Sequence, residues 1–259
     1  MDIHPSAIVE DGAQIGPGCR IGPFCVVGAK VVLHEGVILK SHVIVTGDTQ
    51  IGPDTVVFPF SVIGEIPQDM KFAGEDTQLR IGARNQIREH VTMNTGTAGG
   101  GGVTRVGDDG LFMAGCHIAH DVQIGNRVIV VNQSAIAGHV IIEDDVIVGG
   151  LSGIHQFVRL GQGAIIGALS MVTADVLPHG LVMGPRAHLE GLNLTGLKRR
   201  GVARADIAAL RRAMAELRDG EGTFNDRAAR LGQTDDSTYV RQMVAFITGA
   251  SDRHFLTPK

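Results

Sequence analysis

Apolar side chains recur at every sixth residue of this chain in two unbroken series. The first series contains Ile3, Val9, Ile15, Ile21, Val27, Leu33, Leu39, Val45, Ile51, Val57 and Ile63. The second contains Val106, Phe112, Ile118, Ile124, Val130, Ile136, Ile142, Val148, Ile154, Leu160, Ile166 and Val172. A period of six fits neither an α-helix nor a single extended strand. It predicts a parallel β-helix of hexapeptide repeats, in which each hexad is a short strand plus a turn and three hexads close one triangular coil.

The period also predicts which side chains fill the prism. The recurring apolar residue points inward, and the residue two places earlier points inward with less room. Cys19, Cys25 and Cys116 occupy this second position, so we interpret them as core residues rather than metal ligands or disulfide partners. The residue after the aliphatic is often Gly, as at Gly16 and Gly22. We expect a positive φ there, at the corner of the coil.

The breaks in the repeat divide the chain. Hexads predict a prism over residues 1–190 with two extruded loops, near residues 66–78 and 94–105. In the first, carboxylates such as Asp69 replace aliphatics; in the second, a glycine run interrupts the phase. Loops on rigid scaffolds commonly carry binding residues. Residues 191–259 are predicted to form a small helical domain.

Two features characterise this C-terminal segment. Apolar residues at spacings of three and four, such as Ile207 and Leu210, predict helices. Lys198, Arg199 and Arg200 form a basic cluster in a chain of net charge −4. A solvated helix face explains such a cluster, and so does a site for an acidic partner or a phosphate group.

The remaining composition indicates a cytoplasmic protein. No apolar stretch reaches the roughly eighteen residues of a membrane span. The first residues lack the charged start and apolar stretch of a signal peptide. We therefore predict neither stable membrane insertion nor a nucleic-acid partner.

Histidines gather on one strip of the predicted prism. Residues eighteen apart stack in successive coils. This spacing aligns His120 with Gly138 and Gln156, and it aligns Asp121 with His139 and Phe157. His117 and His155 lie beside these two rows. None of the four histidines occupies an inward position of its hexad. We expect this strip on the outer face of the prism.

Three chemistries could use such a cluster. A metal site needs three converging ligands. Nucleophilic catalysis needs an activated Ser or Cys, but Ser134 and Cys116 are predicted to point inward. General-base catalysis needs one histidine with an orienting neighbour and room for a substrate. The third interpretation requires the fewest assumptions.

Four segments together resemble one family, the UDP-N-acetylglucosamine O-acyltransferases that begin lipid A biosynthesis. They are His117-Ile118-Ala119-His120-Asp121, the loop from Gln68 to Glu75, His155-Gln156-Phe157, and the segment from Gly196 to Gly201. The resemblance covers nearly the whole chain. It implies a left-handed β-helix and a cytoplasmic homotrimer with active sites at subunit interfaces. It also implies transfer of a 3-hydroxyacyl chain from acyl carrier protein to UDP-N-acetylglucosamine.

The resemblance assigns roles to individual residues. His120 is implied as the general base, Asp121 as its orienting carboxylate and Gly138 as the backbone donor to the oxyanion. Implied substrate contacts are His117, His139, His155 and Gln156 beside the sugar nucleotide and acyl chain; Gln68, Asp69 and Lys71 in the first loop; and Asn193, Arg199 and Arg200 near the donor's phosphopantetheine arm and acyl carrier protein. Ala168 matches the residue that measures the acyl chain, which implies about 12 carbons. No metal is implied, and no cofactor beyond the phosphopantetheine of the carrier protein.

One departure leaves the acceptor open. Better-known members have histidine where this chain has Asn94, and an asparagine cannot carry a proton at neutral pH. The acceptor is therefore either the 3-hydroxyl sugar nucleotide, which we favour, or its 3-amino analogue. Further alternatives are an acetyl-CoA-dependent hexapeptide acetyltransferase and a metal-dependent hydratase.

Overall fold

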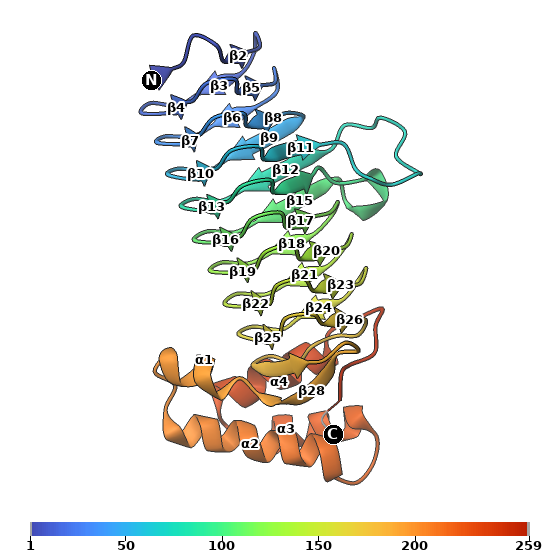
Figure 1. Ribbon diagram of the computed structural model, residues 1–259. Helices are drawn as coiled ribbons and strands as arrows, with labels where there is room; N and C mark the ends of the chain where they lie inside the picture. The colour runs from blue at the N-terminus through green and yellow to red at the C-terminus, as the bar shows by residue number, and fades with distance from the viewer. Residues whose placement is uncertain (1, 258–259) are drawn as a thin grey trace.

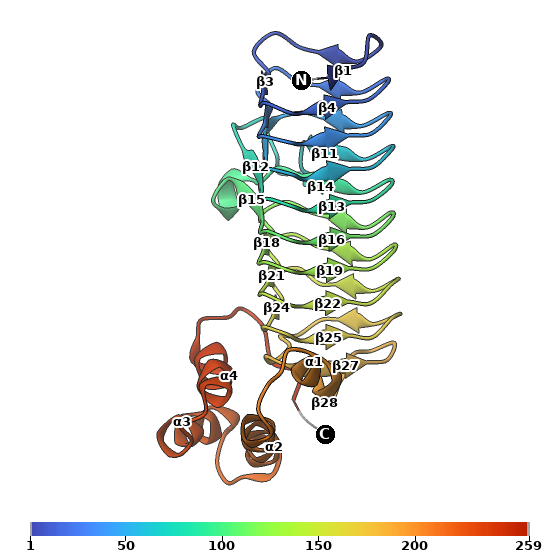
Figure 2. The same cartoon turned by 90° about the vertical axis from the view of Figure 1, so that its left-hand side faces the viewer.

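The computed structural model describes residues 2–257, which form a left-handed parallel β-helix followed by a group of helices (Figure 1, Figure 2). Three sheets, here A, B and C, are the faces of the prism. Sheet A contains β1 (Asp2–Ile3), β4 (Arg20–Ile21), β7 (Ile38–Leu39), β10 (Val56–Val57), β13 (Gln86–Ile87), β16 (Leu111–Phe112), β19 (Ile129–Val130), β22 (Ile147–Val148), β25 (Ile165–Ile166), β27 (Gly180–Met183) and β28 (His188–Leu192). Sheet B contains β2 (Ile8–Val9), β5 (Val26–Val27), β8 (Ile44–Val45), β11 (Val62–Glu65), β14 (Thr92–Asn94), β17 (His117–Ile118), β20 (Ala135–Ile136), β23 (Gly153–Ile154) and β26 (Met171–Val172). Sheet C contains β3 (Gln14–Ile15), β6 (Val32–Leu33), β9 (Asp48–Ile51), β12 (Gln78–Ile81), β15 (Val103–Val106), β18 (Gln123–Ile124), β21 (Ile141–Ile142) and β24 (Arg159–Leu160).

The six-residue period sets the register and the core. Strands pair in parallel with partners eighteen residues away, as Val26 pairs with Ile44. The recurring apolar residues fill the prism, and Ile63, Phe112 and Ile136 are fully buried. The predicted fold class is therefore confirmed. The prism is held together by stacked aliphatic layers rather than by an aromatic core.

Among the glycines that follow an aliphatic, Gly64 has the expected positive φ (88°), but the expectation was wrong at Gly16 and Gly22. The left-handed backbone falls two residues later, for example at Phe24 (φ 59°) and His42 (φ 58°), and neither Gly16 nor Gly22 has a positive φ. A Cβ on Gly16 would lie 2.8 Å from the carbonyl carbon of His34 in the next coil. Glycine is needed there because successive coils approach closely, not because the turn requires its φ.

The three cysteines are core residues, as predicted. Cys19, Cys25 and Cys116 are free and buried. Burial raises the pKa of the Cys116 thiol to about 12. A thiol with so high a pKa is a poor nucleophile at neutral pH.

Two loops leave the prism on the same side, where Figure 1 shows them projecting together. The first covers residues 66–77, between β11 and β12. The second covers residues 95–102 and includes the short 3₁₀ helix η1 (Ala98–Gly100). Strand β15 resumes at Val103, so the second loop is shorter than the sequence predicted.

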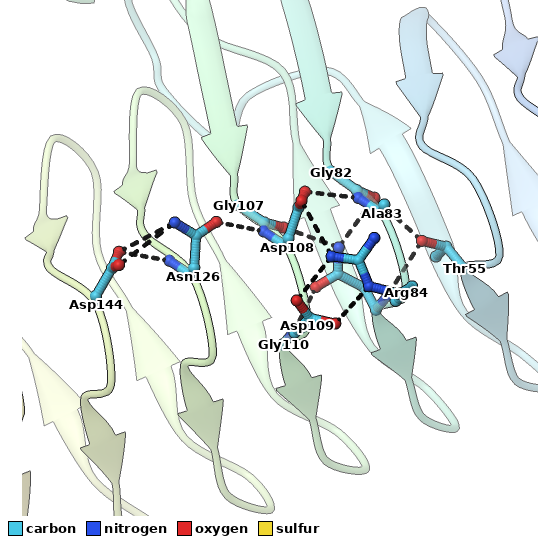
Figure 3. Close-up of polar contacts among 11 residues, drawn as sticks. Thr55, Gly82, Ala83, Arg84, Gly107, Asp108, Asp109, Gly110, Asn126 and Asp144 are labelled. Carbon is cyan, nitrogen blue, oxygen red and sulfur yellow. Dashed lines mark hydrogen bonds and ion pairs between the residues drawn. The ribbon is translucent and has the colours of Figure 1, made fainter. Parts of the chain in front are cut away.

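The corner between sheets C and A carries a polar ladder (Figure 3). The carboxylate of Asp108 accepts from the N–H of Ala83 at 2.8 Å, and Asn126 Oδ1 accepts from the N–H of Asp108 at 2.8 Å. The Arg84 guanidinium holds the pKa of the neighbouring Asp109 carboxyl below its usual range. In this ladder, a side chain of one coil thus accepts a hydrogen bond from a backbone N–H of the coil before it.

The C-terminal segment covers the last coil. Strands β27 and β28 form an antiparallel hairpin. The helices are α1 (Leu194–Arg199), α2 (Arg204–Asp219), α3 (Phe224–Thr234) and α4 (Thr238–Thr248). Ile207 and Leu210 are buried, as their helical spacing predicted. Within residues 2–257 no helix has the length and hydropathy to cross a bilayer.

His179, in the junction between prism and helices, should make stability depend on pH. The ring is 1% exposed, and burial lowers its pKa to about 4, from an ordinary value near 6.5. Between these pH values the unfolded chain binds the proton and the folded chain does not. Stability should therefore fall as pH falls from about 6.5 to 4, by about 3 kcal/mol. Denaturant unfolding across this range should show a shallower pH dependence for His179→Gln than for the unmodified protein; equal slopes would contradict the prediction.

Candidate active site

A pocket of about 470 Å³ opens on sheet B near its corner with sheet C. Its walls come from β17, β20, β23 and β26, the turns that follow the first three of these strands, and the first loop. The lining residues are Gln68, His117, Ala119, His120, Ala135, Ile136, Ala137, Gly138, Gly153, Ile154, His155, Gln156 and Met171. The structure thus brings six of the predicted site residues together: Gln68, His117, His120, Gly138, His155 and Gln156.

His120 and Asp121 form a hydrogen-bonded pair. His120 Nδ1 lies 2.8 Å from Asp121 Oδ2, so Nδ1 carries the hydrogen that the carboxylate accepts. The other nitrogen, Nε2, is then an acceptor with a free lone pair. A histidine oriented in this way can remove a proton from a substrate.

The second loop buries this pair. Both residues lie outside the aliphatic interior, as an outer-face position predicts, but His120 is only 5% exposed and Asp121 only 3%. Thr97 in the loop donates to both carboxylate oxygens of Asp121, through its backbone N–H at 2.8 Å and its Oγ1 at 2.6 Å. A Cβ on Gly100 would collide with the carboxylate. The glycine run therefore allows the loop to close over the carboxylate.

Gly138 presents an unused backbone donor beside His120. Its N–H makes no hydrogen bond within residues 2–257. Prolines such as Pro23 and Pro59 occupy the same place in other hexads, which shows that the coil does not need this N–H. A Cβ on Gly138 would lie 2.7 Å from His120 Nε2. His120 Nε2 and Gly138 are therefore adjacent, an arrangement that could serve a base and an oxyanion donor.

Three aromatic rings line the corner, and the stack of His139 on Phe157 is the one that the eighteen-residue spacing predicted. His120 meets His139 edge-on at 5.1 Å, and His139 stacks on Phe157 at 4.5 Å between ring centroids. Burial lowers the pKa of His139, and the Asp121 carboxylate opposes this effect. Burial also lowers the pKa of His117, whose Nδ1 lies 2.8 Å from Thr92 Oγ1. Both rings are thus biased toward the neutral form.

An apolar floor extends from the histidines. His117, Ala135, Gly153 and Met171 are register partners on successive strands of sheet B. The two central residues are small, and Met171 is 49% exposed at the far end. Such a channel of small residues ending at a large one suits an extended alkyl chain.

The donor atoms around Asp121 do not offer a free metal site. His139 Nε2 lies 3.8 Å from Asp121 Oδ2, close enough to suggest shared ligation. However, His120 Nδ1 is committed to the carboxylate, and both carboxylate oxygens already accept from Thr97. A metal held here would have to break these contacts, which disfavours the hydratase alternative.

The other residues predicted in the first loop, Asp69 and Lys71, are not in the lining of this pocket. Asp69 is partly buried, and its charge raises the pKa of His139 against the larger effect of burial. Lys71 is exposed, with its backbone N–H donating to Asp69 Oδ1 at 3.0 Å. Asn94 is buried and donates from Nδ2 to the carbonyls of Glu65 and Ile66, at 3.2 and 2.9 Å. Asn94 therefore anchors the start of the first loop by hydrogen bonds.

Four further predicted site residues also do not line this pocket within one chain. Asn193 is the N-cap of α1: Oδ1 accepts from the N–H of Gly196 at 2.9 Å. Arg199 and Arg200 lie at the end of α1 and are exposed. Ala168 lies on the exposed turn before β26. Their predicted roles remain predictions.

The sequence interpretation missed Thr97, Thr104 and Met171. Thr104 Oγ1 accepts from the N–H of Asp121 at 2.8 Å and completes the support of the base. Both threonines lie in or beside the glycine-rich segment, so their contact with Asp121 depends on how the loop closes. Met171 is an outward residue eighteen places after Gly153, and that spacing could have identified it.

The coiled hexads and the histidine-lined pocket define the class, a hexapeptide-repeat acyltransferase. The family described as "Udp N-acetylglucosamine O-acyltransferase; Domain 2" matches residues 175–256. An acyl-[acyl-carrier-protein]–UDP-N-acetylglucosamine O-acyltransferase of Paracoccus denitrificans is 65% identical over 199 residues, 77% of this chain and 76% of the relative. The enzyme of that name from Agrobacterium fabrum is 46% identical over 258 residues, 99% of this chain and 95% of the relative.

Solved structures agree. A crystal structure of a UDP-N-acetylglucosamine acyltransferase matches 100% of both chains with a TM-score of 0.96 and 38% identity. One from Acinetobacter baumannii matches 98% of this chain and 99% of its own with a TM-score of 0.93 and 36% identity. This chain belongs to the UDP-N-acetylglucosamine O-acyltransferase family.

Proposed function

We propose that the protein transfers a 3-hydroxyacyl chain from acyl carrier protein to the 3-hydroxyl of UDP-N-acetylglucosamine, the first step of lipid A biosynthesis. Family membership supports the reaction. The observation that carries the mechanism is the close approach of the His120 ring to Gly138, where an added Cβ would lie 2.7 Å from Nε2, with Asp121 on the other ring nitrogen.

The chemistry needs one base and one oxyanion donor. His120 Nε2 takes the proton of the sugar hydroxyl, whose oxygen attacks the thioester carbonyl. The N–H of Gly138 binds the oxyanion of the tetrahedral intermediate. The intermediate then expels the phosphopantetheine sulfur, and the His120 imidazolium returns its proton to that sulfur. Asp121 stabilises the imidazolium between the two transfers.

The hydroxyl acceptor remains favoured over the 3-amino analogue. Asn94 is the residue that raised the alternative. Its Nδ2 is occupied by two backbone carbonyls of the first loop, and it does not line the pocket. Anchoring of the loop therefore accounts for an amide at this position without a change of acceptor.

We further propose a cytoplasmic homotrimer that uses no metal and no cofactor apart from the carrier protein's phosphopantetheine. Arg199 and Arg200 do not reach the histidine pocket of their own chain, so a site that used them would need a neighbouring copy. Exposed apolar residues support such contacts. Phe24 and Phe60 stack on His42 along the corner of sheets A and B and are 59% and 52% exposed.

A direct assay tests the function. Purified protein is incubated with UDP-N-acetylglucosamine and 3-hydroxyacyl carrier protein, and the acylated sugar nucleotide is detected by mass spectrometry. Parallel reactions replace the acceptor with its 3-amino analogue or the donor with acetyl-CoA. Faster product formation in either parallel reaction would replace the proposed function with the corresponding alternative.

Reversing the charge of Arg199 and Arg200 should raise the KM for the carrier-protein donor and weaken its dependence on salt. A cluster of cations mainly speeds the association of an acidic partner, and dissolved salt screens this attraction. Donor KM measured across a salt series checks the result. An unchanged donor KM would assign these arginines to a solvated helix face.

Replacing Ala168 with Gly should lengthen the preferred acyl chain from about 12 carbons by one or two methylenes. Each methylene contributes about 1–3 kcal/mol of discrimination, so the preference should be partial. Rates with donors of 10 to 16 carbons test this, with Met171→Ala in parallel because Met171 ends the pocket of this chain. A shift with Met171→Ala alone would remove Ala168 as the determinant of length.

A further inference from the structure

The C-terminal tail returns from the helices to the catalytic face of the prism. After α4 ends at Thr248, the chain runs back to Asp175, in the segment that follows the last coil strand β26. The N–H of Asp175 donates to the carbonyl of His254, and the N–H of Leu256 donates to the carbonyl of Asp175, both at 2.7 Å. Residues 254–256 are therefore attached to the prism by backbone hydrogen bonds.

A buried ion pair strengthens this attachment. Asp175 is fully buried, and its Oδ2 accepts from Arg159 Nε at 2.7 Å and from Ser251 Oγ at 2.5 Å. The Arg159 guanidinium lies over the ring of Phe246, 4.4 Å from its centroid. Because a buried carboxylate needs these donors, the position of the tail is closely specified.

Arg253 extends from this fixed tail to the wall of the histidine pocket. Its N–H donates to Ser251 Oγ at 3.0 Å, which orients the residue. Its Nε donates to the carbonyl of Gln156 at 3.0 Å, and its Nη2 lies 3.0 Å from His155 Nδ1. A guanidinium only donates hydrogen bonds, so His155 Nδ1 is the acceptor. His155 Nδ1 also lies 3.3 Å from the Gln156 carbonyl, but its shorter contact with the guanidinium favours the neutral tautomer whose ring hydrogen is on Nε2.

We propose that Arg253 is a positioning residue for substrate binding, acting through His155 and the Gln156 carbonyl. It selects the tautomer in which His155 offers Nε2–H to a substrate acceptor atom. It also holds the turn that carries Gln156, and the N–H of Phe157 in that turn donates to the carbonyl of Gly138 at 3.2 Å. The C-terminal tail thus acts on the pocket through His155 and Gln156. The inference deepens the proposed function and rests on it for the kinetic part.

The kinetic test uses the full-length chain and four variants: Arg253→Ala, Arg253→Lys, His155→Ala and the Arg253→Ala/His155→Ala double variant. Arg253→Ala should raise the KM of at least one substrate by about tenfold, with kcat nearly unchanged, because a charge-assisted contact that orders the binding site is lost. Arg253→Lys should recover part of the loss. Arg241→Ala, an exposed arginine on α4, is the matched control.

The double variant shows whether Arg253 positions His155 or only stabilises the fold. If Arg253 acts through His155, removing both side chains should cost no more than removing His155 alone. Fully additive effects, or an unchanged KM for both substrates in Arg253→Ala, would overturn the proposal. Matching thermal unfolding of Arg253→Ala and Arg241→Ala would show that a changed KM is not a folding defect.

A spectroscopic test needs no substrate. Nitrogen NMR of protein labelled in histidine, with His155→Ala to assign the signal, reports which ring nitrogen of His155 carries the hydrogen. The unmodified chain should show the Nε2–H form, and Arg253→Ala should show a mixture of tautomers. A mixture already present in the unmodified chain would overturn the proposal even if the enzyme acted on other substrates.

Discussion

Replacing His120 with alanine should lower kcat by about 10²–10⁴-fold while leaving the fold intact. We propose this ring as the base, because Asp121 holds its Nδ1 and its Nε2 lies beside Gly138. Although His120 is buried, it lies outside the aliphatic interior, beside Asp121 and the next coil. Its removal therefore empties space in the pocket rather than in the core. Steady-state rates with saturating substrates measure the loss.

His34→Ala provides the matched control. The His34 side chain is exposed in the turn after β6, at the corner between sheets C and A and away from the pocket. This variant should retain normal turnover. More than about a tenth of normal activity in His120→Ala would show that another group removes the proton, since a positioned base contributes at least about a hundredfold.

Replacing Gly138 with alanine should lower kcat by about a hundredfold. The added Cβ would lie 2.5 Å from His120 Cε1 and 2.7 Å from Nε2, so the ring must move. A misplacement of about 1 Å at a reacting group costs about 10²-fold in rate. Gly138 does not have a positive φ, so the alanine backbone itself is unstrained.

Gly99→Ala is the control for this substitution. A Cβ on Gly99 meets nothing within 4 Å, and this residue also lacks a positive φ. Both variants should unfold at the same temperature as the unmodified protein. Normal kcat in Gly138→Ala would mean that the imidazole can shift without loss, and that the tight contact is not part of the catalytic geometry.

Local sequence patterns determined the prism. The six-residue period requires three short strands per coil, and the same arithmetic placed His120 against Gly138 and His139 against Phe157. Helical spacing located α2 and α4. It did not separate α3, although Thr223 and Asp226 form a capping box that marks its start. These features were predictable because each depends on residues that are close in sequence or one coil apart.

The function of the inter-hexad glycine was not predictable from the period. Gly16 looked like a corner residue, because a glycine in a repeat usually marks a positive φ. The spacing alone does not show that its Cα faces the backbone of the next coil. Only the distance between coils distinguishes these two reasons for glycine.

The sequence by itself determined the fold class, the stacking of the histidines and, through resemblance, the family. Only the tertiary structure decided that the second loop buries Asp121 under Thr97, that Asn94 ties down the first loop and that Arg253 reaches His155 from 98 residues away. The physical reason is the range of the interactions. The register of the coils follows from the six-residue repeat, because each hexad pairs with hexads one coil away. The closure of the second loop and the docking of the tail depend on side chains that are far apart in sequence and do not recur at a fixed spacing, so no periodic pattern reveals them.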